Sequence, residues 1–219
     1  MSLQFRNRSE AGQILARSLA QYRNQPDVLV LGLARGGVPV ASEVARSLNA
    51  PLDVFIARKL GVPGHEEFAM GAMASGGVAI LNHNTVESLR IPQTLIDLAV
   101  EREGSELRRR ERLYRANRPP IDVTGCTVIL VDDGIATGAT MRAAIGSLRQ
   151  MKAKSIVVAT PVAALAAIWD LRALVDRFVA VVTPADFRAV GEWYENFWQV
   201  TDSEVRELLK QESSAQKAA

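Results

Sequence analysis

The chain has 219 residues, of which 48% are hydrophobic and 23% are charged, proportions that exclude a disordered, collagen-like or coiled-coil chain. The formal net charge of +2 is too small to create a strong attraction to DNA or to an anionic membrane. Cys126 is the single cysteine, which excludes an internal disulfide framework and a cysteine-rich zinc site, and two histidines, His65 and His83, do not favour a histidine-rich metal site.

The sequence contains no segment with the pattern of a secretory signal or a membrane span. The first ten residues, MSLQFRNRSE, lack the apolar core of a signal peptide. The longest apolar stretch, Ile156–Trp169, is interrupted by Thr160 and Pro161 and falls short of the roughly 18 apolar residues that a spanning helix needs. We therefore expect a cytoplasmic protein.

Apolar and amphipathic segments alternate through the first half of the chain. Ser9 has the chemistry of a helix N-cap, and the helix after it is expected to end near Tyr22. Residues 59–76 are rich in glycine and carry mixed charge, so a long loop is expected there. The pattern further predicts a strand over 27–33, a helix over 40–48, a strand over 54–57 and a short strand over 78–81, for which antiparallel pairing is an option.

The second half continues the alternation after one long helix. That helix is expected over 92–117, beginning near Pro92 and ended by Pro119 and Pro120. The predicted elements that follow are strands over 127–131, 155–160 and 178–182 and helices over 140–151, 162–173 and 202–211. Alternating strands and helices favour an α/β fold, with a mostly parallel sheet and helices on both faces. We expect a single domain over 1–212, with a helical insertion or hood over 83–118 and a frayed tail over 213–219.

The segment over 128–141 carries the strongest chemical pattern. An apolar strand ends in two adjacent carboxylates, Asp132 and Asp133, and a turn of small residues precedes a helix. The backbone N–H groups of such a turn and of the helix N-terminus form an anion site. Carboxylates there would repel a bare phosphate, but a sugar between them removes the conflict, because they accept hydrogen bonds from its vicinal hydroxyls. The pattern predicts a site for a ribose 5-phosphate unit, although a structural turn with an Asp-capped helix would also fit.

This run resembles the phosphoribosyl-diphosphate signature of the type I phosphoribosyltransferases. The resemblance implies that Asp132 and Asp133 contact the ribose hydroxyls. It also implies that the following turn holds the 5′-phosphate, through Ala136, Thr137, Gly138, Ala139 and Thr140. A Rossmann fingerprint and a Walker A sequence are both absent.

A second strand–turn–helix segment, over 31–40, places a basic residue before two glycines. Gly36 and Gly37 expose backbone N–H groups, and Arg35 can hold a phosphate bidentately. The segment is similar to the family's pyrophosphate loop, which implies that Ala34, Arg35, Gly36 and Gly37 bind pyrophosphate. The resemblance further points to a non-proline cis peptide at Ala34–Arg35. A glycine pair that merely allows close helix packing is the alternative.

A third segment begins with Arg58 and Lys59 at the end of a predicted strand. Family members close a mobile loop over the site, so the resemblance implies a flexible loop hairpin here, with Arg58 and Lys59 as catalytic groups that neutralise the departing pyrophosphate. His65, with Glu66 and Glu67, could orient a nucleophile. A solvated strand end and an exposed loop histidine are the alternatives.

The stretch over 101–118 is rich in arginine and glutamate. Glu106 with Arg110, and Glu111 with Arg115, stand at the i,i+4 spacing of helical ion pairs. A solvated, salt-bridged helix explains this pattern, and contact with RNA or a hood over the site are the alternatives.

Aromatic residues follow the last predicted strand. Among them, Phe187, Trp193 or Tyr194 could stack on an acceptor base, a place that the family resemblance gives to this region. Packing in a core or a dimer contact is the alternative.

The whole chain resembles a subgroup of stand-alone bacterial phosphoribosyltransferases with no assigned acceptor. The resemblance implies transfer of a phosphoribosyl group from phosphoribosyl diphosphate to a nitrogen nucleophile such as a nucleobase, with release of pyrophosphate, in nucleotide and nucleoside metabolism. Mg²⁺ would be held by the ligand and by water rather than directly by the protein. A homodimer is expected by analogy. Two other functions stay open: a regulator that senses phosphoribosyl diphosphate and binds RNA or a protein partner, and hydrolysis of phosphoribosyl diphosphate.

Overall fold

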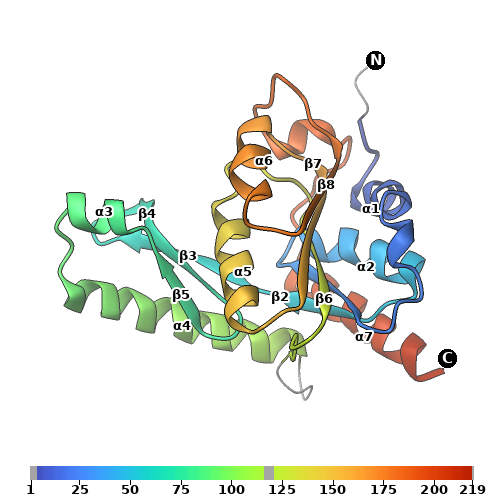
Figure 1. The fold of residues 1–219 in the computed structure, drawn as a ribbon, viewed down its shortest axis with the longest axis horizontal. Coiled ribbons are helices and arrows are strands. Elements are labelled where there is room, and N and C mark those ends of the chain that lie inside the picture. Colours follow the sequence, from blue (N-terminus) through green and yellow to red (C-terminus); the bar gives the residue numbers. More distant parts are fainter. Residues whose placement is uncertain (1–3, 116–120, 219) are drawn as a thin grey trace.

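Figure 1 shows a computed structural model that describes residues 4–115 and 121–218. Its centre is a five-stranded sheet in the order β2-β1-β6-β7-β8, with all neighbouring strands parallel. Its strands are β1 (Val28–Leu33), β2 (Leu52–Phe55), β6 (Thr127–Val131), β7 (Ser155–Val162) and β8 (Arg177–Val182). The strands at its centre are aliphatic and buried along most of their length, as a parallel sheet between two helical layers requires. The predicted α/β class is confirmed.

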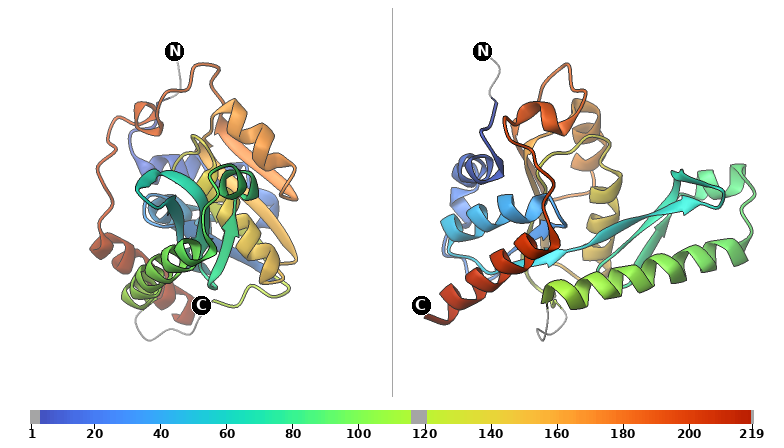
Figure 2. Two further views of the ribbon diagram at one scale, coloured as in Figure 1. Left: turned by 90° about the vertical axis from the view of Figure 1, so that its left-hand side faces the viewer. Right: turned by 180° about the vertical axis from the view of Figure 1, so that it is seen from behind.

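Helices cover both faces of this sheet (Figure 2). Alternate strand residues belong to two buried clusters, because successive side chains of a strand point to opposite faces. Val30 and Ile129 share one cluster with residues of the helices α1, α2 and α7, while Leu31 and Leu130 share the other with residues of α5 and α6. These helices are α1 (Arg8–Arg17), α2 (Gly37–Leu48), α5 (Ala139–Gln150), α6 (Leu165–Arg172) and α7 (Asp202–Ala218).

A second, antiparallel sheet projects from the core as an arm (Figures 1 and 2). Its strands are β3 (Ala57–Val62), β4 (His65–Ala74) and β5 (Val78–Leu81). The chain then returns through α3 (His83–Ser88) and the long α4 (Gln93–Arg115), which packs along β3 and β4. Helix α5 contacts all three strands of the arm, so the arm is joined to the core by packing as well as by the chain.

The structure changes several element boundaries. Asn7, not Ser9, caps α1 by accepting a hydrogen bond from the N–H of Glu10, and the helix ends at Arg17, before a short 3-10 turn over Ala20–Tyr22. The expectation of a long loop over 59–76 is wrong, because β3 and β4 occupy most of that segment. Their pairing shifts register at Leu60–Gly61, which obscured the strand alternation in the sequence.

The chain's later elements also differ in length from the prediction. Strand β7 continues to Val162, so the predicted helix over 162–173 begins only at Leu165. Helix α7 continues to Ala218, so 213–218 is helical rather than frayed. The predicted stop signal of the long helix, Pro119 and Pro120, lies outside the described residues. None of the helices that the structure describes is long and apolar enough to cross a membrane.

Candidate active site

The loops after the neighbouring strands β1 and β6 pack against each other. Gly32 pairs with Val131 across these strands, so both loops leave the sheet at the same edge. A Cβ atom at Gly36 would lie 2.1 Å from Oδ2 of Asp133, and one at Gly37 would lie 2.4 Å from the carbonyl oxygen of Val131. Only glycine allows this approach, so the structure brings together the two segments that the sequence singled out.

The helices that follow these loops begin without a side-chain cap. No side chain caps α2 at Gly36 or α5 at Gly138, whereas Asn7 caps α1 and Asn82 caps α3. The first N–H groups of an uncapped helix can donate to an anion, and the helix dipole favours negative charge there. Gly138 has a φ of 72°, which lets the 136–140 turn enter α5 directly.

The two carboxylates lie at the end of β6, where burial and their mutual proximity disfavour the charged forms. The N–H of Asp133 donates to Oδ1 of Asp132 at 2.9 Å. Burial and the adjacent charge of Asp133 raise the pKa of Asp132 well above its ordinary value. Burial also raises the pKa of Asp133, and the guanidinium of Arg8 opposes that rise. A ligand that donates hydrogen bonds to these two carboxylates would stabilise their charged forms.

Arg8 is a member of this site that the sequence did not indicate. Its Nε donates to Oδ2 of Asp133 at 2.8 Å, and its Nη1 donates to the carbonyl oxygen of Trp198 at 2.7 Å. The guanidinium lies 3.9 Å from the centre of the Phe197 ring. Arg8 and Asp133 are far apart in sequence and share no motif, so only the fold of α1 against the sheet brings them together.

A cavity of about 370 Å³ opens at this edge of the sheet. Its lining includes the expected Arg35, Gly36 and Asp133, together with three groups that the sequence analysis did not name: Arg8, Phe197 and the 199–200 segment. The peptide bond between Ala34 and Arg35 is cis, as the family resemblance implies. Nη1 of Arg35 lies 3.6 Å from Oδ1 of Asp202, the first residue of α7.

Arg58 and Lys59 lie on opposite faces of β3. Nε of Arg58 donates to Oε2 of Glu103 at 2.8 Å, so Arg58 is bound to helix α4. Lys59 is exposed, and it is in register with Ala72 of β4 and Ile80 of β5, so these three side chains share the face of the arm that Arg58 does not. Ile80 packs on Gly146 of α5 from this face. Lys59 is therefore the basic residue of the pair on the side of α5, the helix that begins at the 136–140 turn.

The aromatic residues after β8 form a small core rather than an open stacking surface. Tyr194 is buried between Phe5 and Phe197 and donates its hydroxyl to the carbonyl oxygen of Asp133 at 2.6 Å. Burial raises the pKa of its phenol. Trp193 is half-buried against the same cluster, and Phe187 is half-buried in the connection after β8. Phe197, which the sequence analysis overlooked, is the aromatic residue that lines the cavity.

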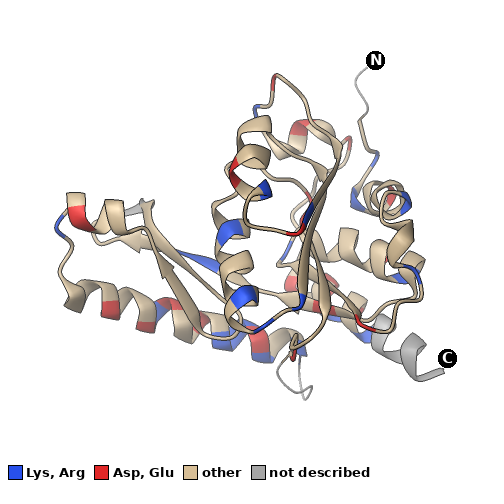
Figure 3. Cartoon of the chain, viewed as in Figure 1, with Lys and Arg blue, Asp and Glu red and all other residues tan. Residues whose placement is uncertain are grey.

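Helix α4 carries basic and acidic residues along its length (Figure 3), and part of this charge is paired within the helix. Arg109 and Arg110 both bind Glu106, at 2.7 and 2.8 Å, and they lower the pKa of that carboxyl to about 2. The contact between Glu106 and Arg110 is the i,i+4 pair that the sequence predicts. The second predicted pair does not form, because Arg115 instead approaches Asp53 at 3.4 Å.

The donor set of the site fits a hard cation held mainly through water. No group of three or more His, Cys, Asp or Glu side chains that could bind a metal occurs in the part of the chain that the structure describes. Two adjacent carboxylates suit Mg²⁺, which takes oxygen ligands, keeps several waters and binds through substrate phosphates. Asp132 and Asp133 would hold such an ion through water. His65 is exposed on β4, and the side chains of Glu66 and Glu67 lie outside the described part.

Comparison with known proteins identifies relatives over nearly the whole chain. The model of the phosphoribosyl transferase domain family matches residues 4–201. A Mycobacterium tuberculosis protein, provisionally named a phosphoribosyl transferase, is 44% identical over 205 residues, which cover 94% of this chain and 46% of the relative. The chain thus spans about half the length of this curated relative.

Two further relatives have different coverage. The crystal structure of TT1426 from Thermus thermophilus is 42% identical, with a TM-score of 0.83, over 95% of this chain and 98% of that protein. The Bifunctional protein PyrR of Chloroflexus aurantiacus is 33% identical over 121 residues, or 54% of this chain and 60% of that protein. Both loops of the candidate site and all five strands of the central sheet fall inside residues 4–201, the region that the family model matches.

Proposed function

This chain belongs to the phosphoribosyl transferase domain family, and on that premise we propose that it transfers the 5-phosphoribosyl group of phosphoribosyl diphosphate to a nitrogen nucleophile, a nucleobase, and releases pyrophosphate. One observation carries the proposal: the carboxylates at the end of β6 lie against the Arg35–Gly37 loop, and uncapped helices begin behind both loops. An acidic pair between two anion sites matches a sugar that bears phosphate groups at both ends.

Each part of the ligand has a proposed place. The ribose hydroxyls donate to Asp132 and Asp133, and the 136–140 turn takes the 5′-phosphate through its N–H groups and the hydroxyls of Thr137 and Thr140. The pyrophosphate lies on the Ala34–Gly37 loop, where Arg35 adds a cation. Mg²⁺, when bound with the ligand, would neutralise pyrophosphate charge.

The proposed reaction breaks the bond between C1 of the ribose and the pyrophosphate oxygen, which keeps the electron pair. The base nitrogen then forms a bond to C1 and loses its proton to the solvent or to a basic group. Positive charge develops on the ribose ring, and it would favour and be stabilised by the ionised forms of Asp132 and Asp133, which the ribose hydroxyls also stabilise by donating hydrogen bonds. On the arm, Lys59 faces the α5 side, from which it can approach the departing pyrophosphate, whereas Arg58 must first leave Glu103.

A regulatory role is the second candidate, and relatives named Bifunctional protein PyrR motivate it. An RNA-binding surface on α4 has limited support, because Arg109 and Arg110 are already paired with Glu106. We propose the transferase as the main activity, in the cytoplasm and as a homodimer. Phe187 and Trp193 remain the proposed acceptor-side residues, to which Phe197 is added.

The decisive test is titration calorimetry with phosphoribosyl diphosphate and Mg²⁺, followed by a pyrophosphate-release screen over free nucleobases. The proposal expects binding and base-dependent release, and neither in the double variant Asp132→Asn, Asp133→Asn. Binding without release for any base would favour the regulator, and release without any base would favour hydrolysis. Full affinity in the double variant would overturn the site assignment. Light scattering on the same samples gives the oligomeric state.

A further inference from the structure

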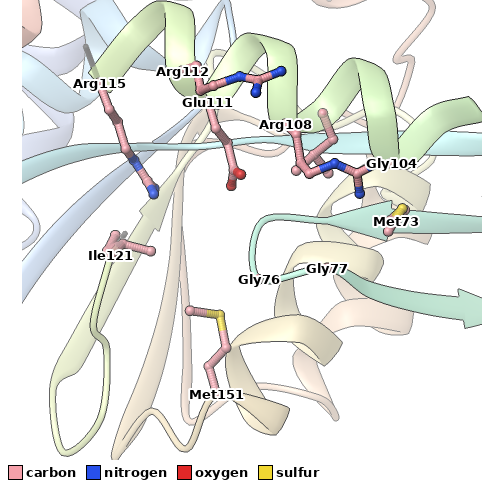
Figure 4. Close-up of a pocket in the computed structure, with 11 residues that line it drawn as sticks. Met73, Gly76, Gly77, Gly104, Arg108, Glu111, Arg112, Arg115, Ile121 and Met151 are labelled. Carbon is pink, nitrogen blue, oxygen red and sulfur yellow. The ribbon is translucent and has the colours of Figure 1, made fainter. Parts of the chain in front are cut away.

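A second cavity, of about 440 Å³, lies outside the candidate active site (Figure 4). It is enclosed by α4, by the turn between β4 and β5, and by Met151 at the end of α5. Helix α5 has 12 residues and begins at the 136–140 turn, so about 18 Å of helix lies between that turn and Met151 at this cavity. The volume is that of a small-molecule site.

Arginines of α4 line one wall of this cavity. Arg108, Arg112 and Arg115 follow an i, i+4, i+7 spacing and therefore share one face of the helix. Within the described residues, Arg108 and Arg112 form no ion pair. The neighbouring Arg109 and Arg110, by contrast, both bind Glu106. Like charges along one face repel each other, so an anion in the cavity would relieve the repulsion.

A carboxylate stands among these arginines without pairing with them. Figure 4 shows Glu111 directed from α4 into the cavity, and no hydrogen bond or ion pair of this side chain occurs within the described residues. Arg115 is fixed elsewhere: its Nη2 donates to the carbonyl oxygen of Val54 at 3.0 Å, and Asp53 lies 3.4 Å from its Nε. Glu111 is thus left as an acceptor for a ligand.

The rest of the lining is apolar. Met73 and Met151 flank the β4–β5 turn, and Leu107 and Ile121 also line the cavity. Thioethers pack well against aromatic rings. At Gly76 the φ is 89° and a Cβ would lie 2.8 Å from Sδ of Met151, so only glycine lets the turn approach the methionine.

We propose that this cavity binds a nucleoside monophosphate, and the proposal goes beyond the transferase function. The phosphate lies between Arg108 and Arg112, whose guanidinium groups match its geometry. The base packs on Met73 and Met151, and its N–H edge donates to Glu111. Guanine fits this edge best, because its N1–H and 2-amino group present two adjacent donors to one carboxylate.

The test must separate this cavity from the active site, where a product nucleotide could also bind. Titration calorimetry therefore uses full-length protein carrying Asp132→Asn and Asp133→Asn, with GMP, AMP, UMP, inorganic phosphate and a single-stranded RNA as separate titrants. The proposal expects one saturable site with GMP as the tightest titrant. Added R108A and R112A should weaken GMP binding at least tenfold, and added E111Q should reduce the preference for GMP over phosphate at least threefold.

The matched control is the pair R109A and R110A, which removes the same charge from the same helix, and neither residue lines the cavity. It should leave GMP affinity unchanged. Melting temperatures close to that of the parent protein establish that the exposed Arg108 and Arg112 variants fold. The proposal is overturned by any of four results: no nucleotide binding, phosphate as tight as GMP, equal weakening by the control pair, or binding of RNA alone. Weakening of GMP binding by R108A and R112A but not by R109A and R110A assigns the binding to this cavity, so the outcome does not depend on the transferase proposal.

Discussion

Nε of Arg8 lies 2.8 Å from Oδ2 of Asp133, in an ion pair whose side chains are only 12% and 13% exposed. The pair connects the first helix to the carboxylates at the end of β6. Arg8 is the cation that opposes the raised pKa of Asp133, so it keeps this carboxylate available as an acceptor. A residue near the N-terminus therefore favours the charged form of one carboxylate of the candidate site.

The variant Arg8→Ala should lose both stability and ligand affinity. It leaves a largely buried carboxylate without its charge partner, which costs about 2 kcal/mol, measured as the free energy of unfolding in urea at pH 7. Without the guanidinium the pKa of Asp133 rises further, so phosphoribosyl-diphosphate affinity should fall about tenfold and partly recover at higher pH. Arg6→Ala is the control, because the Arg6 side chain is 71% exposed and, within residues 4–115 and 121–218, its one ion pair is with Glu10 on the surface. Equal losses in both variants would contradict this role.

The variant Asp132→Asn should stabilise the protein while removing its ligand affinity. The pKa of Asp132 is raised on folding, so the folded state binds a proton more readily than the unfolded state. Its contribution to stability is therefore present at low pH and is lost as the pH rises above 3.8 and through the folded-state pKa. Asparagine removes this penalty, and we expect a gain of about 1 kcal/mol at pH 7.

Urea unfolding across a pH series measures this gain for Asp132→Asn. The difference between variant and parent should grow with pH in the acidic range and then level off. Asp186→Asn serves as the control, because the Asp186 side chain is 82% exposed and its removal should change the free energy of unfolding by less than about 0.5 kcal/mol. If the variant were less stable than its parent at pH 7, the ionised carboxylate of Asp132 would not destabilise the folded state.

The variant Gly36→Ala should displace the carboxylate of Asp133. Its Cβ would lie 2.1 Å from Oδ2, so either the carboxylate or the loop must move. We expect a stability loss of about 1–3 kcal/mol, as for overpacking in a core, and at least a tenfold loss of phosphoribosyl-diphosphate affinity by calorimetry. Gly12→Ala is a matched control, because its Cβ would lie 2.7 Å from the carbonyl oxygen of Val40, between α1 and α2. It should cost stability but leave affinity intact.

The sequence predicted those parts of the site whose chemistry is local. Asp132, Asp133 and the glycines of both loops follow apolar strands within a few residues, so pattern and turn chemistry were enough. Arg8 and Phe197 could not be found in this way, because they reach Asp133 only when α1 and the chain after β8 fold onto the same edge of the sheet. The arm was misread for a related reason: glycines and a register shift in β3 and β4 hide the alternation that marks a strand.

The variant Glu103→Gln should loosen the arm without changing the core. Glu103 is 7% exposed and accepts hydrogen bonds from Arg58 at 2.8 Å and from Arg102 at 3.1 Å, so it ties α4 to β3. Loss of its charge leaves Arg58 without its ion-pair partner, and we expect a cost of about 2 kcal/mol. Hydrogen exchange should accelerate in β3 and β4 and stay unchanged in β6 and β7. Glu106→Gln is the control, because Glu106 pairs with Arg109 and Arg110 on the half-exposed side of the same helix. If the exchange rates of β3 and β4 respond equally to both variants, the link between Arg58 and Glu103 does not hold the arm. If only Glu103→Gln releases them, pyrophosphate release should change as well, because Arg58 becomes free to approach the ligand.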